Sequence, residues 1–343
     1  LGYWFYRILL ECGARRSVSI LCALELLSLP EIVHWSRSTM SEIPALMLII
    51  AASYWFCVWL RSGRPLHSWV AFALAECAFL SRVTTAAVLP AWFVYAVATR
   101  RGKQLLSRHA FTASALYGLT NILWTRYAVS FARYETVQNR IFTHFDRLQL
   151  SAWAYYILNL PLMTGWAPLL GLLVAVVWAV SQLVGATRDS PNDLAKVWLS
   201  WLLSVYLFQT LASVPELRYF VFVLPCVPGL LASLFDVRST ILRRVVAPAS
   251  LALALVANAV NLGRVSRGIV GYEQVAHGLA SVERPGNVLL ATCYYQDLVF
   301  RYRAANPLHE RQLIRGDRTL VIRLAPYADV DTRVTTIAAS DGD

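Results

Sequence analysis

Isolated charged side chains stand at the edges of long apolar stretches, where a charge is unfavourable and needs a chemical reason. They are His34, Arg37 and Glu42 before the apolar run 43–60, Arg82 inside the stretch 67–99, and Arg218 beside Tyr219 before a later run. A guanidinium recognises phosphate through parallel N–H donors held in a fixed fork. A carboxylate among such cations can take up a proton or hold a metal ion. These residue types therefore indicate chemistry on a phosphate-bearing substrate.

Glu42 opens a predicted helix, and two interpretations of it remain open. Ser41 is a typical N-cap residue, and Pro44 fits the first turn, where a missing N–H costs nothing. The helix dipole favours Glu42 at this end, and "TMSE" fits the capping-box pattern. The alternative is a carboxylate that faces a cavity at the membrane surface and acts on a polar substrate or a metal ion.

Arg82 lies between two apolar runs that are each short for a membrane span. A charged side chain deep in a bilayer costs about 2.5–3.5 kcal/mol on insertion scales, and such residues usually mark functional pathways. One interpretation is structural: the side chain snorkels to the surface or pairs with Glu76. The other interpretation is an anion receptor, for which phosphate is the natural partner.

Arg218 and Tyr219 begin a span that prolines are expected to kink. An Arg–Tyr anchor in the aromatic belt of the membrane surface is one interpretation. The other is that Arg37, Arg82 and Arg218 gather around one anion, with Tyr219 also contacting the substrate. We expect this convergence because each arginine stands alone at a span end that is otherwise poor in positive charge.

The histidines give weaker signals. A lone histidine near a membrane surface is more often structural than a ligand, although His34 is kept as a candidate substrate contact. His144 and Asp146 in "FTHFDRLQ" are candidates to complete a site, with His144 and Glu42 as metal ligands, but their spacing is no metal motif. The sequence contains no P-loop, GxSxG, HExxH or dinucleotide fingerprint.

The composition is that of a polytopic membrane protein. The 343 residues are 57% hydrophobic and 15% charged, whereas soluble domains are about 25% charged. The net charge of +11 would suggest nucleic acid for a soluble protein, but here the basic residues fall in loops between apolar runs, so no nucleic acid is expected. Cysteines form no CxxC pair, which argues against a disulfide framework or zinc site.

The apolar runs predict about nine membrane spans, at roughly 20 residues per span. Residues 67–99 are expected to hold two short passes broken near "LSRVTT", with one long kinked helix as the alternative. The remaining predicted spans are 17–33, 43–60, 110–131, 166–185, 195–213, 219–235 and 245–262.

Alternation of these spans places most of the basic flanking residues on one side, which the positive-inside rule assigns to the cytoplasm. Those residues are Arg7, Arg15, Arg16, Arg61, Arg64, Arg100, Arg101, Lys103, Arg108, Arg188, Lys196, Arg238, Arg243 and Arg244. The N-terminus is then inside and the C-terminal segment outside.

Two domains are expected. Residues 1–262 form a transmembrane domain, in which 132–165 lies along the non-cytoplasmic interface as an amphipathic helix and a loop. Residues 263–343 form a small, soluble, non-cytoplasmic α/β domain, with strands at "GNVLLAT" and "TLVIRL" and a helix at "YYQDLVFRYRA". The fold class is thus an α-helical polytopic membrane protein with a small α/β appendage.

Four segments over residues 1–262 resemble polyprenyl-phosphate-sugar glycosyltransferases of the GT-C superfamily, in particular the bacterial aminoarabinose and mannosyl transferase branch. In chain order they are "HWSRSTMSEIPALMLIIAA", "FLSRVTTAAVLPAWFVYAV", "YYILNLPLMTGWAPLLGLL" and "ELRYFVFVLPCVPGLLA". The family's broken hairpin usually carries Lys or Arg where this sequence has Arg82. The order of the segments is stronger evidence than any one of them.

The resemblance implies transfer of a sugar from a polyprenyl-phosphate donor on the non-cytoplasmic face of the bacterial plasma (inner) membrane. It implies a glycan, lipid or protein acceptor, surrounding membrane lipids, and a divalent metal ion as the one cofactor to consider. Arg82, Arg218 and Arg37 would bind the phosphate, and Glu42 would position the acceptor or hold the metal.

The sequence departs from the family at its start. It lacks the first span and the acidic outer loop that supplies the family's essential Asp or Glu, and "LGYWFYRILL" resembles the end of the second span. The chain is then either a fragment or a relative without that carboxylate. We favour an N-terminally truncated fragment and expect it to be inactive as it stands.

Two rival functions use the same residues. A transporter or flippase for an anionic lipid or solute would show paired broken helices in inverted repeats, and the sequence shows one broken pair. A noncatalytic membrane subunit would leave the arginines scattered. Distances among Arg37, Glu42, Arg82 and Arg218 distinguish this last possibility.

Overall fold

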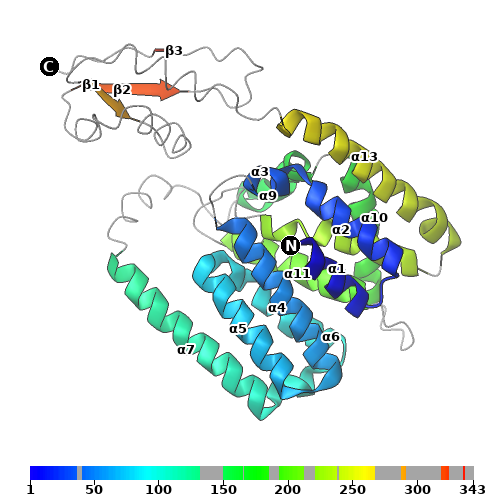
Figure 1. Cartoon of the computed structure of the whole chain (residues 1–343). Helices are drawn as coiled ribbons and strands as arrows, with labels where there is room; N and C mark the ends of the chain where they lie inside the picture. The colour runs from blue at the N-terminus through cyan, green and yellow to red at the C-terminus, as the bar shows by residue number, and fades with distance from the viewer. Residues whose placement is uncertain are drawn as a thin grey trace. The chain divides into compact units, whose positions relative to one another are not determined.

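The chain divides into two compact units, Leu1–Val265 and Ser266–Asp343. The structure, a computed structural model, describes residues 1–36, 41–131, 150–164, 166–184, 193–211, 221–237, 239–266, 287–290, 318–323 and 335–336. The first unit is helical and the strands belong to the second (Figure 1).

The helices of the first unit follow the predicted apolar runs closely. In chain order they are α1 (Gly2–Glu11), α2 (Arg16–Ser28), α3 (Pro30–Ser36), α4 (Glu42–Ser62), α5 (Pro65–Ser81), η1 (Val83–Val88), α6 (Leu89–Ala98), η2 (Gly102–Leu106), α7 (Arg108–Phe131), α9 (Leu150–Thr164), α10 (Trp166–Val184), α11 (Asp193–Leu211), α12 (Cys226–Ser233), η5 (Leu234–Asp236), η6 (Leu242–Val246) and α13 (Ala247–Ser266).

Within the described residues, three helical segments are long and apolar enough to cross a membrane: Glu42–Ser62, Asp193–Leu211 and Leu242–Leu262. Shorter apolar helices cover Val83–Ala98, Gly171–Val180 and Val221–Asp236. A helical membrane protein is therefore supported, while the expected total of about nine spans stays a prediction.

The first predicted span, 17–33, is not one continuous helix. α2 ends at Ser28, and α3 begins at Pro30 after Leu29, which has extended backbone angles. Proline has no backbone N–H and its ring disfavours a helical conformation in the preceding residue, so Pro30 starts a new helix.

The stretch 67–99 is broken as expected rather than continuous. α5 ends at Ser81, Arg82 has extended backbone angles (φ −157°, ψ 113°), and η1 and α6 follow. The Arg82 carbonyl accepts hydrogen bonds from the backbone N–H and the hydroxyl of Thr85, at 3.0 and 2.9 Å. These bonds fix the break and hold Arg82 at its apex.

The helices pack as a bundle in which α4 lies against α1 and α5, and α5 in turn packs against α7 (Figure 1). α11 packs against α6 on one side and α12 on another. α7 exposes large apolar side chains along its length, which is the pattern of a surface that faces lipid. Those side chains include Phe111, Leu116, Leu119, Ile122 and Leu123.

Aromatic side chains fill the centre of the bundle. The fully buried Trp198 of α11 lies 5.2 Å from Phe5 of α1 and 5.5 Å from Trp201, measured between ring centroids. The Trp201 Nε1–H donates to the carbonyl of Phe222 at 2.7 Å, which satisfies the one polar atom of that indole. The core thus joins α1, α11 and the segment that leads into α12.

The predicted interfacial segment 132–165 is described only in its second half. α9 covers Leu150–Thr164 with Pro161 inside it, and the Tyr206 hydroxyl donates to the Trp153 carbonyl. Residues 132–149 lie outside the described part of the chain.

The second unit contains a small mixed sheet. β1 (Asn287–Leu290) runs parallel to β2 (Arg318–Arg323), with Asn287 opposite Arg318, and β3 (Thr335–Thr336) is antiparallel to β2. β1 falls inside "GNVLLAT", and β2 overlaps "TLVIRL". The helix expected at "YYQDLVFRYRA" lies outside the described residues, so the α/β domain stays a prediction.

The close approach of α12 to α11 predicts a glycine requirement. A Cβ atom at Gly229 would overlap the Trp198 indole, so Gly229→Ala should lower the free energy of unfolding by about 1–3 kcal/mol. Gly118→Ala on α7 is the matched control, because no atom lies within 4 Å of the added methyl group. Unfolding in detergent micelles measures both, and equal stability of the two variants would contradict the packing described.

Candidate functional site

Glu42 and Arg82 form an ion pair at one end of the bundle. Nη2 of Arg82 lies 2.8 Å from Oε1 of Glu42. The Glu42 side chain is 0% exposed and the Arg82 side chain is 27% exposed. The pair thus joins the first residue of α4 to the break between α5 and η1, two places that the sequence marked independently.

The start of α4 positions the Glu42 carboxylate without the predicted cap. Ser41 has helical backbone angles and its side chain makes no capping hydrogen bond, so the expected Ser41 cap is absent. The helix starts with a bond from the Ala45 N–H to the Ser41 carbonyl at 3.0 Å, and Pro44 lies in this first turn. The Glu42 carboxylate points instead to the Arg82 guanidinium.

Arg82 pairs with Glu42 rather than with Glu76, the partner considered from the sequence. Both Glu76 carboxylate oxygens are buried and have no hydrogen-bond partner among the described residues, although Glu76 lies on α5, the helix that ends just before Arg82. The ion pair therefore links two helices instead of closing within one. The interpretation that Arg82 serves only to pair with Glu76 on α5 is therefore wrong.

The pair is the main electrostatic compensation of Glu42. Both Glu42 oxygens are inaccessible and have no regular hydrogen bond within the described residues, where the ion pair with Arg82 is the contact that offsets their desolvation. A buried carboxylate without a cation is strongly unfavourable, so each position constrains the other.

The other predicted site residues are not placed by the structure. Arg37, His144, Arg218 and Tyr219 lie outside the described residues, as does Asp146. His34 belongs to helix α3, but its side chain is outside the described part. The expected convergence of three arginines on one anion therefore stays a prediction.

The described residues do not by themselves suit a metal ion at Glu42. Among them there is no group of three or more His, Cys, Asp or Glu side chains that could hold one. The guanidinium 2.8 Å from the Glu42 carboxylate also repels a second cation at that oxygen. The role of Glu42 and His144 as metal ligands stays a prediction.

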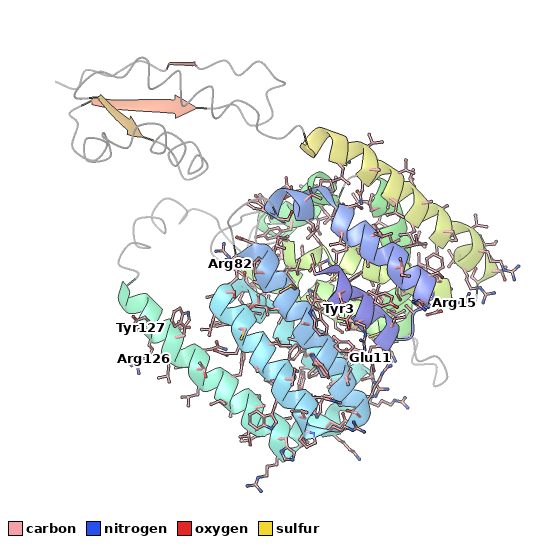
Figure 2. All side chains as sticks on the ribbon, viewed as in Figure 1. Tyr3, Glu11, Arg15, Arg82, Arg126 and Tyr127 are labelled. Carbon is pink, nitrogen blue, oxygen red and sulfur yellow. The ribbon has the colours of Figure 1, made fainter. Side chains whose placement is uncertain are left out.

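A second ion-pair network, which the sequence analysis did not predict, lies at the opposite end of α4. Arg61 contacts Glu11 at 3.3 Å and Asp193 at 2.9 Å, and Arg101 contacts the same Asp193 oxygen at 3.5 Å. Figure 2 shows Arg82 and Glu11 at opposite ends of α4. In the sequence, this network could have been suspected from Asp193, an acidic residue that stands among basic ones at the start of an apolar run.

This network joins several helices at one end of the bundle, and the predicted alternation of the spans stays a prediction. It gathers the end of α1, the end of α4, the segment after α6 and the start of α11 at one end of the bundle. Arg61 and Arg101 were both expected on the basic side. Glu42 and Arg82, about 30 Å away along a helix of 21 residues, belong to the other end.

Glu25 is a further buried carboxylate that the sequence analysis missed. It is 0% exposed on α2, and neither oxygen has a hydrogen-bond partner in the part of the chain that the structure describes. One turn away, the Ser28 hydroxyl accepts a 3.2 Å hydrogen bond from the Asn258 amide of α13. In the sequence, Glu25 stands out as a single acidic residue in an otherwise apolar stretch, but this pattern indicates neither a partner nor a function.

Comparison with known proteins adds one finding. Residues 4–124 match the family model described as dolichyl-phosphate-mannose-protein mannosyltransferase. The match covers about a third of the chain and includes both Glu42 and Arg82. No curated protein and no solved structure matches the chain. The matched segment also contains Glu42–Ser62, one of the helices long and apolar enough to cross a membrane.

The burial of Glu42 predicts a strong energetic coupling. Arg82→Ala leaves the carboxylate without its cation and should lower the free energy of unfolding by about 3–5 kcal/mol. The double variant Glu42→Gln/Arg82→Ala should recover a large part of this loss, because a neutral amide is cheaper to bury. Denaturation in mixed micelles measures the cycle.

Arg126→Ala serves as the control, since Arg126 is an exposed arginine on α7 (Figure 2). A loss for Arg82→Ala no larger than for Arg126→Ala would show that the pair does not stabilise the fold.

Proposed function

We propose that the protein is a membrane glycosyltransferase that moves a sugar from a polyprenyl-phosphate donor to an acceptor hydroxyl on the non-cytoplasmic face. The observation that carries this proposal is the Glu42–Arg82 pair, which lies inside the segment that matches the mannosyltransferase family. It places an oriented guanidinium at the end of the bundle opposite the basic loops.

Arg82 is proposed to bind the donor phosphate. The side chain keeps 27% of its surface exposed, so a lipid-linked substrate can reach it from the bundle end. Negative charge grows on the phosphate oxygens as the bond to the sugar breaks. A fixed cation in a place of low dielectric stabilises that charge without having to reorganise, and so lowers the barrier.

Glu42 is proposed to act by positioning Arg82. Its carboxylate is 0% exposed and already engaged by the guanidinium, so direct contact with an acceptor would require the pair to open. The Glu42 carboxylate binds one side of the guanidinium and restricts the rotamers of Arg82. The proposal is that this leaves the other side of the group to contact the donor phosphate. The earlier interpretations of Glu42, as a catalytic carboxylate or a metal ligand, stay predictions.

The proposed reaction is a displacement at the anomeric carbon of the sugar. The acceptor oxygen forms the new glycosidic bond, and the bond between the anomeric carbon and the phosphate oxygen breaks. The bonding electron pair leaves with the polyprenyl phosphate, and the hydroxyl proton passes to a carboxylate base. The resemblance assigns that base to an acidic outer loop, and Arg82 acts on the leaving group only.

The remaining features of the proposal follow from the sequence. Arg37 and Arg218 would complete the phosphate site, with Tyr219 and His34 as further substrate contacts, while the bilayer holds the donor's polyprenyl tail. The acceptor would be a glycan, a lipid or a protein. The protein would span the bacterial plasma membrane, with the C-terminal unit outside the cytoplasm.

The proposal predicts that the charge and shape of Arg82 both matter. Arg82→Gln should lower kcat for transfer from a polyprenyl-phosphate mannose by about 100-fold or more, and Arg82→Lys should lose less because it keeps a point charge. Transfer is measured with the full-length protein in proteoliposomes, normalised to folded protein.

Arg61→Gln is the matched control, because it disrupts ion pairs of similar length at the other end of α4. It should reduce stability but keep kcat within about threefold, since it is remote from the donor phosphate. Equal kcat for Arg82→Gln and Arg61→Gln would reject the phosphate role.

The positioning role of Glu42 has a separate signature. Glu42→Gln should lower kcat when Arg82 is present but have little further effect in an Arg82→Gln background, because it acts through that guanidinium. Kinetics of the two single variants and the double variant measure this coupling. Additive losses would show that Glu42 acts independently of Arg82.

A further inference from the structure

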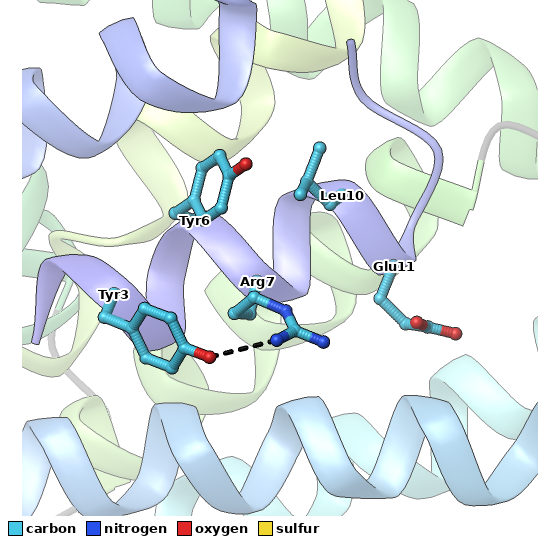
Figure 3. A pocket seen from close by; sticks show the side chains of 5 residues that line it. All are labelled: Tyr3, Tyr6, Arg7, Leu10 and Glu11. Atoms are coloured by element: carbon cyan, nitrogen blue, oxygen red, sulfur yellow. Dashed lines mark hydrogen bonds between the residues drawn. The ribbon is translucent and has the colours of Figure 1, made fainter. Parts of the chain in front are cut away.

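Arg7 of α1 is held by two phenol groups beside a surface pocket. Its Nη1 donates to the Tyr3 hydroxyl at 3.0 Å (Figure 3). Its Nη2 donates to the Tyr54 hydroxyl of α4 at 2.6 Å. The guanidinium carbon also lies 5.0 Å from the centre of the Tyr54 ring and 5.8 Å from that of Tyr3. These contacts fix the position of the cation without neutralising it.

The pocket has a volume of about 360 Å³ and lies along one face of α1. The residues that line it are Tyr3, Tyr6, Arg7, Leu10 and Glu11. Figure 3 shows the Arg7 side chain between α1 and the neighbouring helix, with Glu11 one turn further along α1. A polar opening with an aromatic wall suits a head group that is attached to an apolar chain.

The charge in this pocket is uncompensated. Within the described part of the chain, Arg7 forms no ion pair, and the one carboxylate in the pocket lining, Glu11, is paired with Arg61 at 3.3 Å. Arg7 uses two N–H donors on the tyrosines and retains others. Because each phenol oxygen accepts from Arg7, its own O–H can donate to a further acceptor. The arrangement therefore presents several donors and a net positive charge to a ligand.

The depth of Arg7 identifies the kind of anion. Arg7 lies about 6 Å along α1 from Glu11, and Glu11 belongs to the ion-pair network at the basic end of the bundle. Arg15 and Arg16, which follow α1, are exposed at the same end. If this end faces the cytoplasm, as the basic loops predict, Arg7 lies just below the surface, where the phosphate groups of anionic lipids are found.

We propose that the pocket around Arg7 binds the phosphate group of a lipid in the leaflet at the basic end of the bundle. The guanidinium and the Tyr3 hydroxyl contact the phosphate oxygens, the buried Tyr54 hydroxyl holds the guanidinium in place, and the acyl or polyprenyl chains lie along α1. The site is at the opposite end of the bundle from Arg82 and does not depend on the transferase function.

The test is lipid retention by the purified full-length protein, measured by native mass spectrometry. Phosphatidylglycerol should bind the unaltered protein more strongly than zwitterionic phosphatidylethanolamine. Arg7→Gln should weaken phosphatidylglycerol binding by about tenfold, because it removes charge-assisted hydrogen bonds to the lipid phosphate. Arg16→Gln, which removes an exposed arginine at the same end but outside the pocket, should change binding by less than about twofold.

Tyr54→Phe provides a second variant that keeps the packing of the ring and removes only its hydroxyl. It should also weaken phosphatidylglycerol binding, which keeps the proposal testable even if Arg7→Gln does not fold. A parallel titration with polyprenyl phosphate identifies the source of the phosphate, and preferential binding of either lipid, lost on Arg7→Gln, supports the site. Equal binding by Arg7→Gln and Arg16→Gln, or no preference for anionic lipid, would overturn it.

Discussion

The constraint on which this structure depends is the burial of one carboxylate. Glu42 is 0% exposed in an environment that gives its oxygens no regular hydrogen bond, so its charge requires a cation. Arg82 supplies that cation from the break between α5 and η1, at 2.8 Å. The pair fixes the start of α4 relative to this break and directs one nitrogen of the Arg82 guanidinium at the Glu42 carboxylate. Fold and proposed chemistry thus rest on the same contact.

The two ends of the bundle are organised by different electrostatics. At the basic end, Arg61 and Arg101 share Asp193, and Arg61 also binds Glu11, so that several helices are joined through a network. At the other end one pair holds a partly exposed arginine. Buried aromatic side chains such as Trp198 and Trp201 fill the apolar part between them. Under the proposed function, this packed middle would hold a lipid-linked donor while its phosphate reacts at one end.

The sequence predicted those features that follow from local pattern. The run 43–60 lies inside α4 (Glu42–Ser62), and the expected break near "LSRVTT" is real, because apolar length and charge position are readable along one chain. The partner of Arg82 was not predictable, since Glu42 lies 40 positions away and only tertiary packing selects it over the nearby Glu76. The division of 17–33 was not predicted, because the apolar run continues on both sides of Pro30 and hides the helix break that this proline causes. The ion pairs of Asp193 and the burial of Glu25 also depend on tertiary packing, so the sequence did not predict them.

The most direct test of the central claim is an experimental structure of the full-length protein with bound polyprenyl phosphate, determined by electron cryomicroscopy in a lipid nanodisc. The account predicts the lipid phosphate within about 3 Å of the Arg82 guanidinium, with the Glu42 carboxylate on the opposite side of that group. A phosphate bound elsewhere, with Arg82 enclosed by protein on all sides, would contradict it.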